Sequence, residues 1–130
     1  MNKIPLVARI IFGLVFFASG LAGLLNLMQP PPDLSADMQT FMAGMMAAKY
    51  FFPLLKVTET VCGLMVLTGL FVPLALVILA PIVINIFLVH LFLQPSGLPI
   101  ALVLGLLEIY LAFFVSPYKE PIRRLFSKRL

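Results

Sequence analysis

The sequence predicts an all-α fold, a polytopic membrane bundle of four helices in one domain of 130 residues. Hydrophobic residues make up 62% of the chain and charged residues only 11%, and the mean hydropathy is +1.14. The apolar residues gather in four stretches of about 20 residues, the length that a helix needs to cross a bilayer. A soluble domain of this size could not bury so much apolar surface, so we expect lipid to surround it.

The four predicted spans cover residues 5–28, 50–70, 73–93 and 98–115. They should be helices, because a backbone in lipid has to satisfy its hydrogen bonds internally. Short links that contain Gly and Pro follow the second and third spans, so the last three spans should form antiparallel hairpins. The first apolar run is too long for a signal peptide and no clear cleavage site follows it, so we interpret it as a retained span. Residues 1–130 then form a single membrane domain with a basic tail over 116–130.

The connection between the first two spans is longer and carries helix signals of its own. Pro30, Pro31 and Pro32 should end the first helix, and Ser35 is a suitable N-cap with Asp37 in the first turn. Helical spacing then joins five apolar side chains, which are Met38, Phe41, Met42, Met45 and Met46. This pattern predicts a short amphipathic helix on the membrane surface. The alternative, in which the second span begins early and the methionines are ordinary packing residues, stays open.

Positive charge lies at both ends of the chain. Lys3 and Arg9 flank the start of the first span. Five more cations follow the last span, namely Lys119, Arg123, Arg124, Lys128 and Arg129. Asp33 and Asp37 fall on the opposite side of a bundle with four spans, so the positive-inside rule predicts that both termini are cytoplasmic. The basic tail either contacts anionic head groups or only sets this orientation.

Five polar or ionisable side chains lie inside the predicted spans: Lys56, Glu59, Asn85, His90 and Glu108. A charge at the centre of a spanning helix costs about 2.5–3.5 kcal/mol on insertion scales, so we expect these groups to face one another within the bundle. Lys56 and Glu59 are three residues apart and share one helix face. Asn85 follows a proline by four residues, and a kink there would free a carbonyl and open a polar site.

Two interpretations of this polar set stay open. As a binding pocket, it would accept the head group of a quinone or a similar small molecule. Lys56 or His90 would then donate to a carbonyl oxygen, and a carboxyl group, Glu59 or Glu108, would move protons. This interpretation predicts that Glu59→Gln lowers ligand occupancy without loss of folded protein. As contacts between helices, the same side chains would only hold the bundle together, and no individual catalytic residue is assigned.

Composition argues against several other classes of function. Cys62 is the only cysteine and His90 the only histidine, so neither an intramolecular disulfide nor an intrachain metal site is expected. The positive charge is mostly terminal, so no nucleic-acid partner is expected. Small residues gather on the first span, namely Gly13, Ser19, Gly20 and Gly23. They should pack against another helix of the bundle, with the seam of a homo-oligomer as the alternative.

Three segments carry a resemblance to a known family: residues 9–20 (RIIFGLVFFASG), 41–69 (FMAGMMAAKYFFPLLKVTETVCGLMVLTG) and 71–98 (FVPLALVILAPIVINIFLVHLFLQPSGL). Two motifs within them are fairly specific, Lys56-x-x-Glu59-x-x-x-Gly63 and Ala80-Pro81-x-x-x-Asn85-x-x-x-x-His90. Over nearly its whole length the chain resembles the DoxX family of small four-helix membrane proteins. Glu108 stands where similar proteins carry an acidic residue, and Gly23 stands where many carry a lysine.

The resemblance implies a multi-pass protein of the bacterial inner membrane that takes part in redox chemistry, since the family is named for its association with a thiosulfate:quinone oxidoreductase. A redox protein partner is then expected, and quinone is the candidate cofactor. The chain has no flavin fingerprint, haem ligand pair or thiol pair, so a complete redox enzyme is not expected. We therefore expect a component of a membrane redox assembly that binds a quinone or another small molecule. The alternatives are a non-catalytic scaffold or assembly subunit and, ranked last because no inverted repeat is found, a small transporter.

Overall fold

The computed structural model describes residues 3–27 and 34–126 of the chain, and within them all regular structure is helical. The elements are α1 (Ile4–Leu24), α2 (Ala36–Ala47), α3 (Phe51–Thr68), α4 (Val72–Phe92), the 3₁₀ helix η1 (Pro95–Gly97), α5 (Leu98–Phe113) and α6 (Ser116–Arg124). The prolines at 30–32, expected to end the first helix, fall outside the described residues. α1 already ends at Leu24, before the predicted end of the span.

Within residues 3–27 and 34–126, four helical stretches are long and apolar enough to cross a membrane: α1, α3, α4, and η1 together with α5. They coincide with the four predicted spans to within a few residues at each end. Each keeps large apolar side chains on the outside of the molecule, among them Leu14, Val61, Leu74 and Leu106. A soluble protein rarely exposes so continuous an apolar surface, whereas lipid accommodates it. The predicted all-α membrane bundle of four spans is confirmed.

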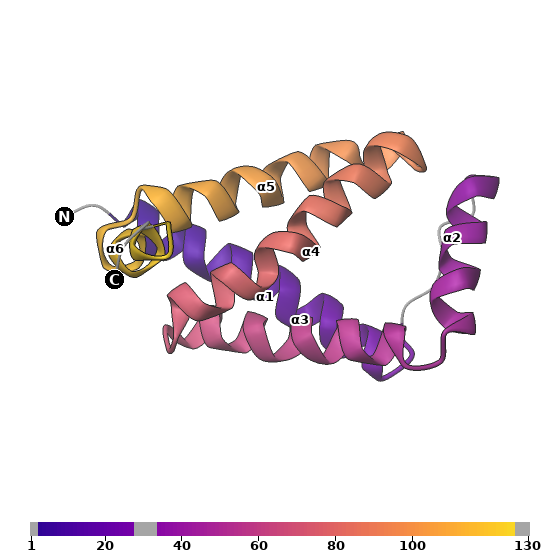
Figure 1. The fold of residues 1–130 in the computed structure, drawn as a ribbon, viewed down its shortest axis with the longest axis horizontal. Helices are drawn as coiled ribbons and strands as arrows, with labels where there is room; N and C mark the ends of the chain where they lie inside the picture. Colours follow the sequence, from indigo (N-terminus) through magenta and orange to yellow (C-terminus); the bar gives the residue numbers. More distant parts are fainter. Residues whose placement is uncertain (1–2, 28–33, 127–130) are drawn as a thin grey trace.

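The spans form two pairs, α1 with α3 and α4 with α5 (Figure 1). α1 and α3 approach backbone to backbone because glycines leave no side chain between them. A Cβ atom at Gly13 would lie 2.7 Å from the backbone nitrogen of Leu67, and one at Gly63 would lie 2.8 Å from the Cα of Phe17. The small residues of the first span therefore pack inside the bundle, as predicted.

A single apolar core joins the two pairs. Phe12 and Phe16 of α1 contact each other with ring centroids 5.0 Å apart, and both belong to the same buried cluster as Leu76 and Leu79 of α4 and Leu111 of α5. α4 leaves α3 at one end of the molecule and diverges from it toward the other, where it turns through η1 into α5 (Figure 1). The polar residues of the different spans therefore do not all meet at one place in the bundle.

α2 is a separate helix, as one of the two open interpretations predicted. Ser35 is its N-cap, and the Ser35 Oγ accepts a hydrogen bond from the Met38 backbone N–H at 3.1 Å. Lys49 follows the helix with a φ of 66°, so the chain turns sharply before α3 and the second span does not begin early. Hydrophobicity differs little between the faces of α2, so the predicted amphipathic character is not found, and its position on a membrane surface stays a prediction.

The same serine ties α2 to the end of α4. The Ser35 backbone N–H donates to Oε1 of Gln94 at 2.7 Å, and the Ser35 Oγ donates to the carbonyl oxygen of Leu93. Figure 1 shows α2 standing across the end of the molecule, beside the end of α4 and the start of α3. This short helix thus links the two helix pairs where they diverge.

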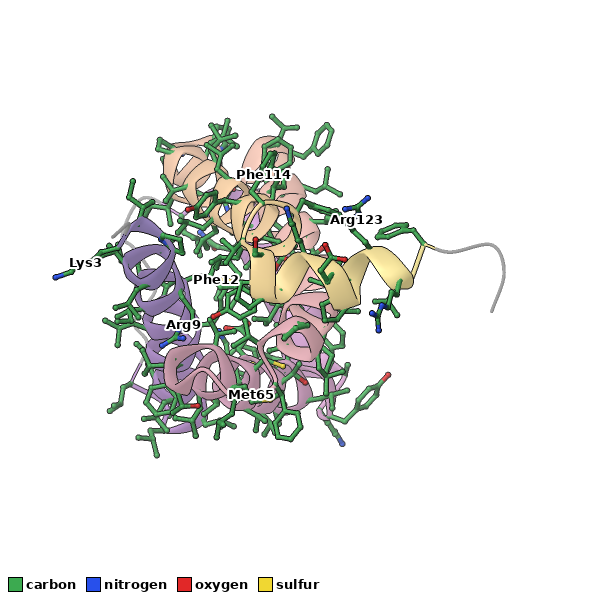
Figure 2. All side chains as sticks on the ribbon, turned by 90° about the vertical axis from the view of Figure 1, so that its left-hand side faces the viewer. Lys3, Arg9, Phe12, Met65, Phe114 and Arg123 are labelled. Carbon is green, nitrogen blue, oxygen red and sulfur yellow. The ribbon has the colours of Figure 1, made fainter. Side chains whose placement is uncertain are left out.

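α6 lies across the opposite end of the bundle (Figure 1). Ile122 is the side chain that it buries against the apolar core. α6 brings Lys119, Arg123 and Arg124 to the end at which α1 begins with Lys3 (Figure 2). The structure thus places these four cations on one side, which agrees with the charge pattern. That this side is cytoplasmic stays a prediction.

Candidate functional site

Lys56 and Glu59 form a buried ion pair on α3. Their side chains are 8% and 5% exposed, and the Lys56 Nζ lies 3.4 Å from Oε1 of Glu59. The ammonium group also donates to the Ser19 Oγ of α1 at 3.4 Å, and it lies 5.5 Å from the centroid of the Phe52 ring. The spacing of three residues correctly placed both charges on one helix face.

The aliphatic part of Lys56 occupies the space beside Gly23 of α1. A Cβ atom at Gly23 would lie 2.6 Å from Cδ and 2.8 Å from Cε of the lysine. The absence of a side chain at Gly23 therefore makes room for Lys56. The pair is enclosed by α1 and α3, and neither of the two cavities described below is lined by Lys56 or Glu59.

His90 belongs to the corner between α4 and η1. Its Nδ1 lies 2.8 Å from the carbonyl oxygen of Ile86. Because a carbonyl oxygen only accepts, Nδ1 carries the proton in this hydrogen bond. The other side of the ring lies against Gly97, where a Cβ atom would lie 2.6 Å from Nε2. His90 is half-buried, and these contacts explain it as a packing residue of the corner.

Asn85 lies on the outer face of α4. It is exposed, it lines neither of the two cavities described here, and it makes no hydrogen bond with the described residues. Leu74 and Ile78, which lie on the same side of the helix by their spacing, are also exposed. Asn85 is thus a polar group on a face that is otherwise apolar.

Glu108 of α5 is in a different position from all of these. The residue is 8% exposed, and its Oε1 is buried without a hydrogen-bond partner among the described residues. It lines a cavity of about 670 Å³ between α4, α5 and α6. Every other lining side chain is apolar, or absent in the case of Gly105. Buried polar atoms in proteins nearly always have a partner, so Glu108 has hydrogen-bonding capacity that the described residues do not use.

Small residues on α5 produce this cavity. Ala101, Gly105, Glu108 and Ala112 follow one another at intervals of four, three and four residues, which places them on one helix face. Across from them α4 contributes Ala80 to the lining. A Cβ atom added to Gly105 would meet nothing within 4 Å, so the facing helices leave open space beside the carboxyl group.

The structure thus brings together two of the five predicted site residues, Lys56 and Glu59. It adds Ser19, which the sequence assigned to helix packing. Asn85, His90 and Glu108 have no hydrogen bond or ion pair with Lys56 or Glu59 among the described residues.

Comparison with known proteins supplies the family. A sequence model described as DoxX matches residues 4–91. The chain belongs to the DoxX family. The match takes in α1 to α3 and nearly all of α4, whereas Glu108 of this DoxX protein lies beyond it. Searches of curated proteins and of solved structures give no match.

Sequence reasoning identified Glu108 in this DoxX protein but missed the cavity around it. The signal was present in the chain, because Ala101, Gly105 and Ala112 share the helical face of Glu108. A run of small residues does not by itself distinguish tight packing from a cavity, since the same pattern on α1 gives close contact with α3. What decides between them is the size of the opposing side chains and the divergence of the helices.

Proposed function

We propose that this DoxX protein binds a lipid-soluble molecule with a polar head group, of the quinone class, in the cavity lined by Glu108. One observation carries the proposal: Glu108, whose Oε1 is buried without a partner among the described residues, lines an otherwise apolar cavity of about 670 Å³. Cavities of about 300–1,000 Å³ with apolar walls and few polar groups are typical of small-molecule sites.

The position of the cavity suits a ligand that arrives through the membrane. Ile84 of α4 and Leu106 of α5 line it and are 59% and 67% exposed on the apolar outside of the molecule. A head group could therefore enter between α4 and α5 while its hydrocarbon tail stays in the lipid. A water-soluble ligand would have no comparable polar route.

Glu108 can serve both forms of such a head group. A protonated carboxyl group donates a hydrogen bond to a quinone carbonyl oxygen, and an ionised one accepts a hydrogen bond from a quinol hydroxyl group. A bound quinone would supply the electron-carrying chemistry. The chain itself would orient the ring, exclude water with its apolar walls and hold a proton at the Glu108 carboxyl group.

Native mass spectrometry with a short-chain ubiquinone analogue tests the proposal. We expect one analogue per protein chain, and binding of its reduced quinol form about tenfold weaker in Glu108→Gln, because a neutral amide loses the charge-assisted hydrogen bond that a carboxylate accepts from a quinol hydroxyl group. Glu59→Gln is the matched control, since Glu59 has Lys56 as its partner and does not line the cavity. The structure thus favours Glu108 over Glu59, the residue preferred from sequence, as the ligand-sensitive carboxyl group.

A second variant separates the cavity from the carboxyl group. Gly105→Leu keeps Glu108 but fills the open space beside it, so it should also lower occupancy. Equal binding by the wild type, Glu108→Gln and Gly105→Leu would contradict the proposal. Loss of binding in Glu59→Gln alone would place the ligand between α1 and α3 instead.

Asn85 favours a second candidate function, that of a scaffold or assembly subunit. A primary amide exposed to lipid is unfavourable unless it finds a hydrogen-bond partner, and helices in membranes associate through such groups. The exposed amide on α4 therefore supports a partner helix, which a redox protein or a second copy of the chain would supply. Cross-linking in the native membrane should give an adduct that Asn85→Leu abolishes and Ile78→Leu retains. No adduct from the wild type would count against this function.

We place the protein in the bacterial inner membrane with both termini in the cytoplasm. The support is the shared location of Lys3 and the cations of α6 at one end of the bundle and of Asp37 on α2 at the other end. Positively charged loops are retained on the cytoplasmic side. The head group of a ligand beside Glu108 would then lie nearer the cytoplasmic end of α5, since Phe113, the last residue of this helix, is only five positions after Glu108.

A further inference from the structure

Arg9 of α1 is a cation that the proposed function does not use. It lies at the end of the molecule that α6 crosses (Figure 2). Its Nη1 donates to the hydroxyl oxygen of Tyr118 at 3.3 Å, and its Nε is buried without a partner among the described residues. The ion pairs within the described part of the chain join Lys56 to Glu59 and Arg123 to Glu120, so no carboxylate there neutralises Arg9.

The guanidinium group is held in place by the turn between α3 and α4. Gly69 ends α3 with a φ of 82°, and a Cβ atom there would lie 2.9 Å from Nη1 and 3.3 Å from Cζ of Arg9. The arginine thus fills the space that a side chain at this turn would need. Together with the Tyr118 hydrogen bond, this contact fixes a charged group that would otherwise extend freely toward the membrane surface.

Arg9 lines a cavity of about 490 Å³ between the start of α1 and the junction of α5 with α6. Three hydroxyl-bearing residues also line it, which are Tyr110, Ser116 and Tyr118. The Tyr118 oxygen accepts from Arg9, so its own proton is available to an acceptor in the cavity. Leu6 and Phe114 contribute apolar walls. The site therefore combines a fixed cation, hydroxyl donors and an apolar border.

We propose that this cavity binds a phosphate group, supplied by the head group of an anionic phospholipid. A guanidinium fork matches the oxygens of a phosphate and is preferred over ammonium for such contacts. Basic pockets between spanning helices on one face of a membrane recognise phosphorylated lipid head groups. Lys119, Arg123 and Arg124 of α6 lie at the same end and add attraction for negative lipid. Free phosphate shares this chemistry but would leave the apolar border uncovered.

The inference stands apart from the proposed function. The Arg9 cavity and the Glu108 cavity share no lining residue, and they would take ligands of different chemistry. Failure of quinone binding would leave the phosphate site untouched, and the reverse also holds.

Native mass spectrometry of the full chain, extracted in mild detergent and supplied with phosphatidylglycerol or phosphatidylcholine, tests the inference. We expect one phosphatidylglycerol to be retained in preference to phosphatidylcholine. Arg9→Gln should weaken this retention about tenfold, as expected for loss of a charge-assisted hydrogen bond. The matched control is Arg124→Gln, which removes the same charge from an exposed position of α6 and should retain the lipid. Addition of inorganic phosphate distinguishes the sources, because displacement of the lipid at millimolar phosphate would identify soluble phosphate as a competing ligand of the same site.

Two further variants keep the test decisive if Arg9→Gln does not fold. Tyr118→Phe removes one hydroxyl donor and should weaken retention by a smaller factor, while Arg9→Lys keeps the charge and should retain part of the selectivity. Equal retention of the two lipids by the wild type would overturn the inference. So would an equal loss in Arg9→Gln and Arg124→Gln, since that result reports only the diffuse charge of this end of the molecule. If Arg9→Gln does not fold, unchanged phosphatidylglycerol retention in Tyr118→Phe would overturn it.

Discussion

Lys56 and Glu59 form a buried ion pair in which the stability of each charge depends on the other. Each charge is buried beside the other, and Ser19 supplies a further hydrogen bond from α1. A buried ion pair adds little net stability over apolar residues of similar size, but either charge alone in the same place is strongly unfavourable. The main effect of the pair is therefore that each charge offsets the free-energy cost of burying the other.

This reasoning predicts how substitutions at the pair combine. Lys56→Met or Glu59→Met alone should lower the free energy of unfolding by about 3 kcal/mol, because each leaves one uncompensated buried charge. The double variant should be more stable than either single variant. Thermal unfolding in detergent measures all three proteins against the wild type. A double variant as unstable as the sum of the two single losses would show that the charges act independently.

α1 and α3 pack closely against each other as a helix pair. Gly63 faces the backbone of Phe16 and Phe17, where a methyl group has no room. Close approach through small residues is a common way for membrane helices to associate, since lipid provides no hydrophobic force between them. The helix pair depends on a few glycines more than on large side chains.

Gly63→Ala should therefore separate α1 from α3 and destabilise the protein by about 1–3 kcal/mol, the usual cost of inserting a carbon into a packed interface. Gly105→Ala on α5 is the matched control, because a methyl group there meets nothing within 4 Å. Unfolding of both variants in detergent gives the comparison. Equal stability of the two would contradict the close contact between α1 and α3.

The hydrogen bonds of Ser35 connect the start of α2 to the end of α4. Ser35→Ala removes the N-cap and the contact with Leu93, so the first amides of α2 should lose about 1 kcal/mol of protection. Hydrogen exchange followed by mass spectrometry should detect faster exchange in α2. Thr40→Ala, which removes a hydrogen bond within α2 only, should leave the link to α4 intact. Unchanged exchange in Ser35→Ala would mean that other contacts hold α2.

The number and order of the spans could be predicted from sequence because lipid imposes a simple rule of length and polarity on each helix. The N-cap role of Ser35 was predictable for a different reason, because it depends only on the residues next to it in the sequence. The shared helix face of Lys56 and Glu59 was predictable because it depends only on their spacing. The places of Asn85, His90 and Glu108 were not, because they depend on how far α4 diverges from α3 and which face it turns to α5. Hydrophobic patterns that are nearly uniform around a helix do not encode that rotation.

The two ends of the bundle differ in the charges that they carry. Lys3, Arg9 and the cations of α6 lie at one end, and Asp37 of α2 lies at the other. We therefore expect the bundle to be oriented with its positive end in the cytoplasm. Both proposed ligands would approach this bundle from lipid, although at different places on it.

Labelling with a membrane-impermeant maleimide tests the orientation. The only native cysteine, Cys62, is 3% exposed within a span, so it should give little background. Ser96→Cys, in η1, should react in intact cells, whereas Glu120→Cys, in α6, should react only after the membrane is permeabilised. The opposite pattern would reverse the orientation, and labelling of both positions in intact cells would contradict a membrane crossing by α5.

Photolabelling tests whether the proposed ligand occupies the cavity beside Glu108. A quinone analogue with a photoreactive group is bound to the purified protein, irradiated, and located by peptide mass spectrometry. We expect saturable labelling of the cavity faces of α4 and α5, around Phe87 and Leu102, with competition by unlabelled analogue and weaker labelling in Glu108→Gln. Saturable labelling confined to α1 and α3, or labelling spread over all lipid-facing helices without saturation, would contradict the proposed site.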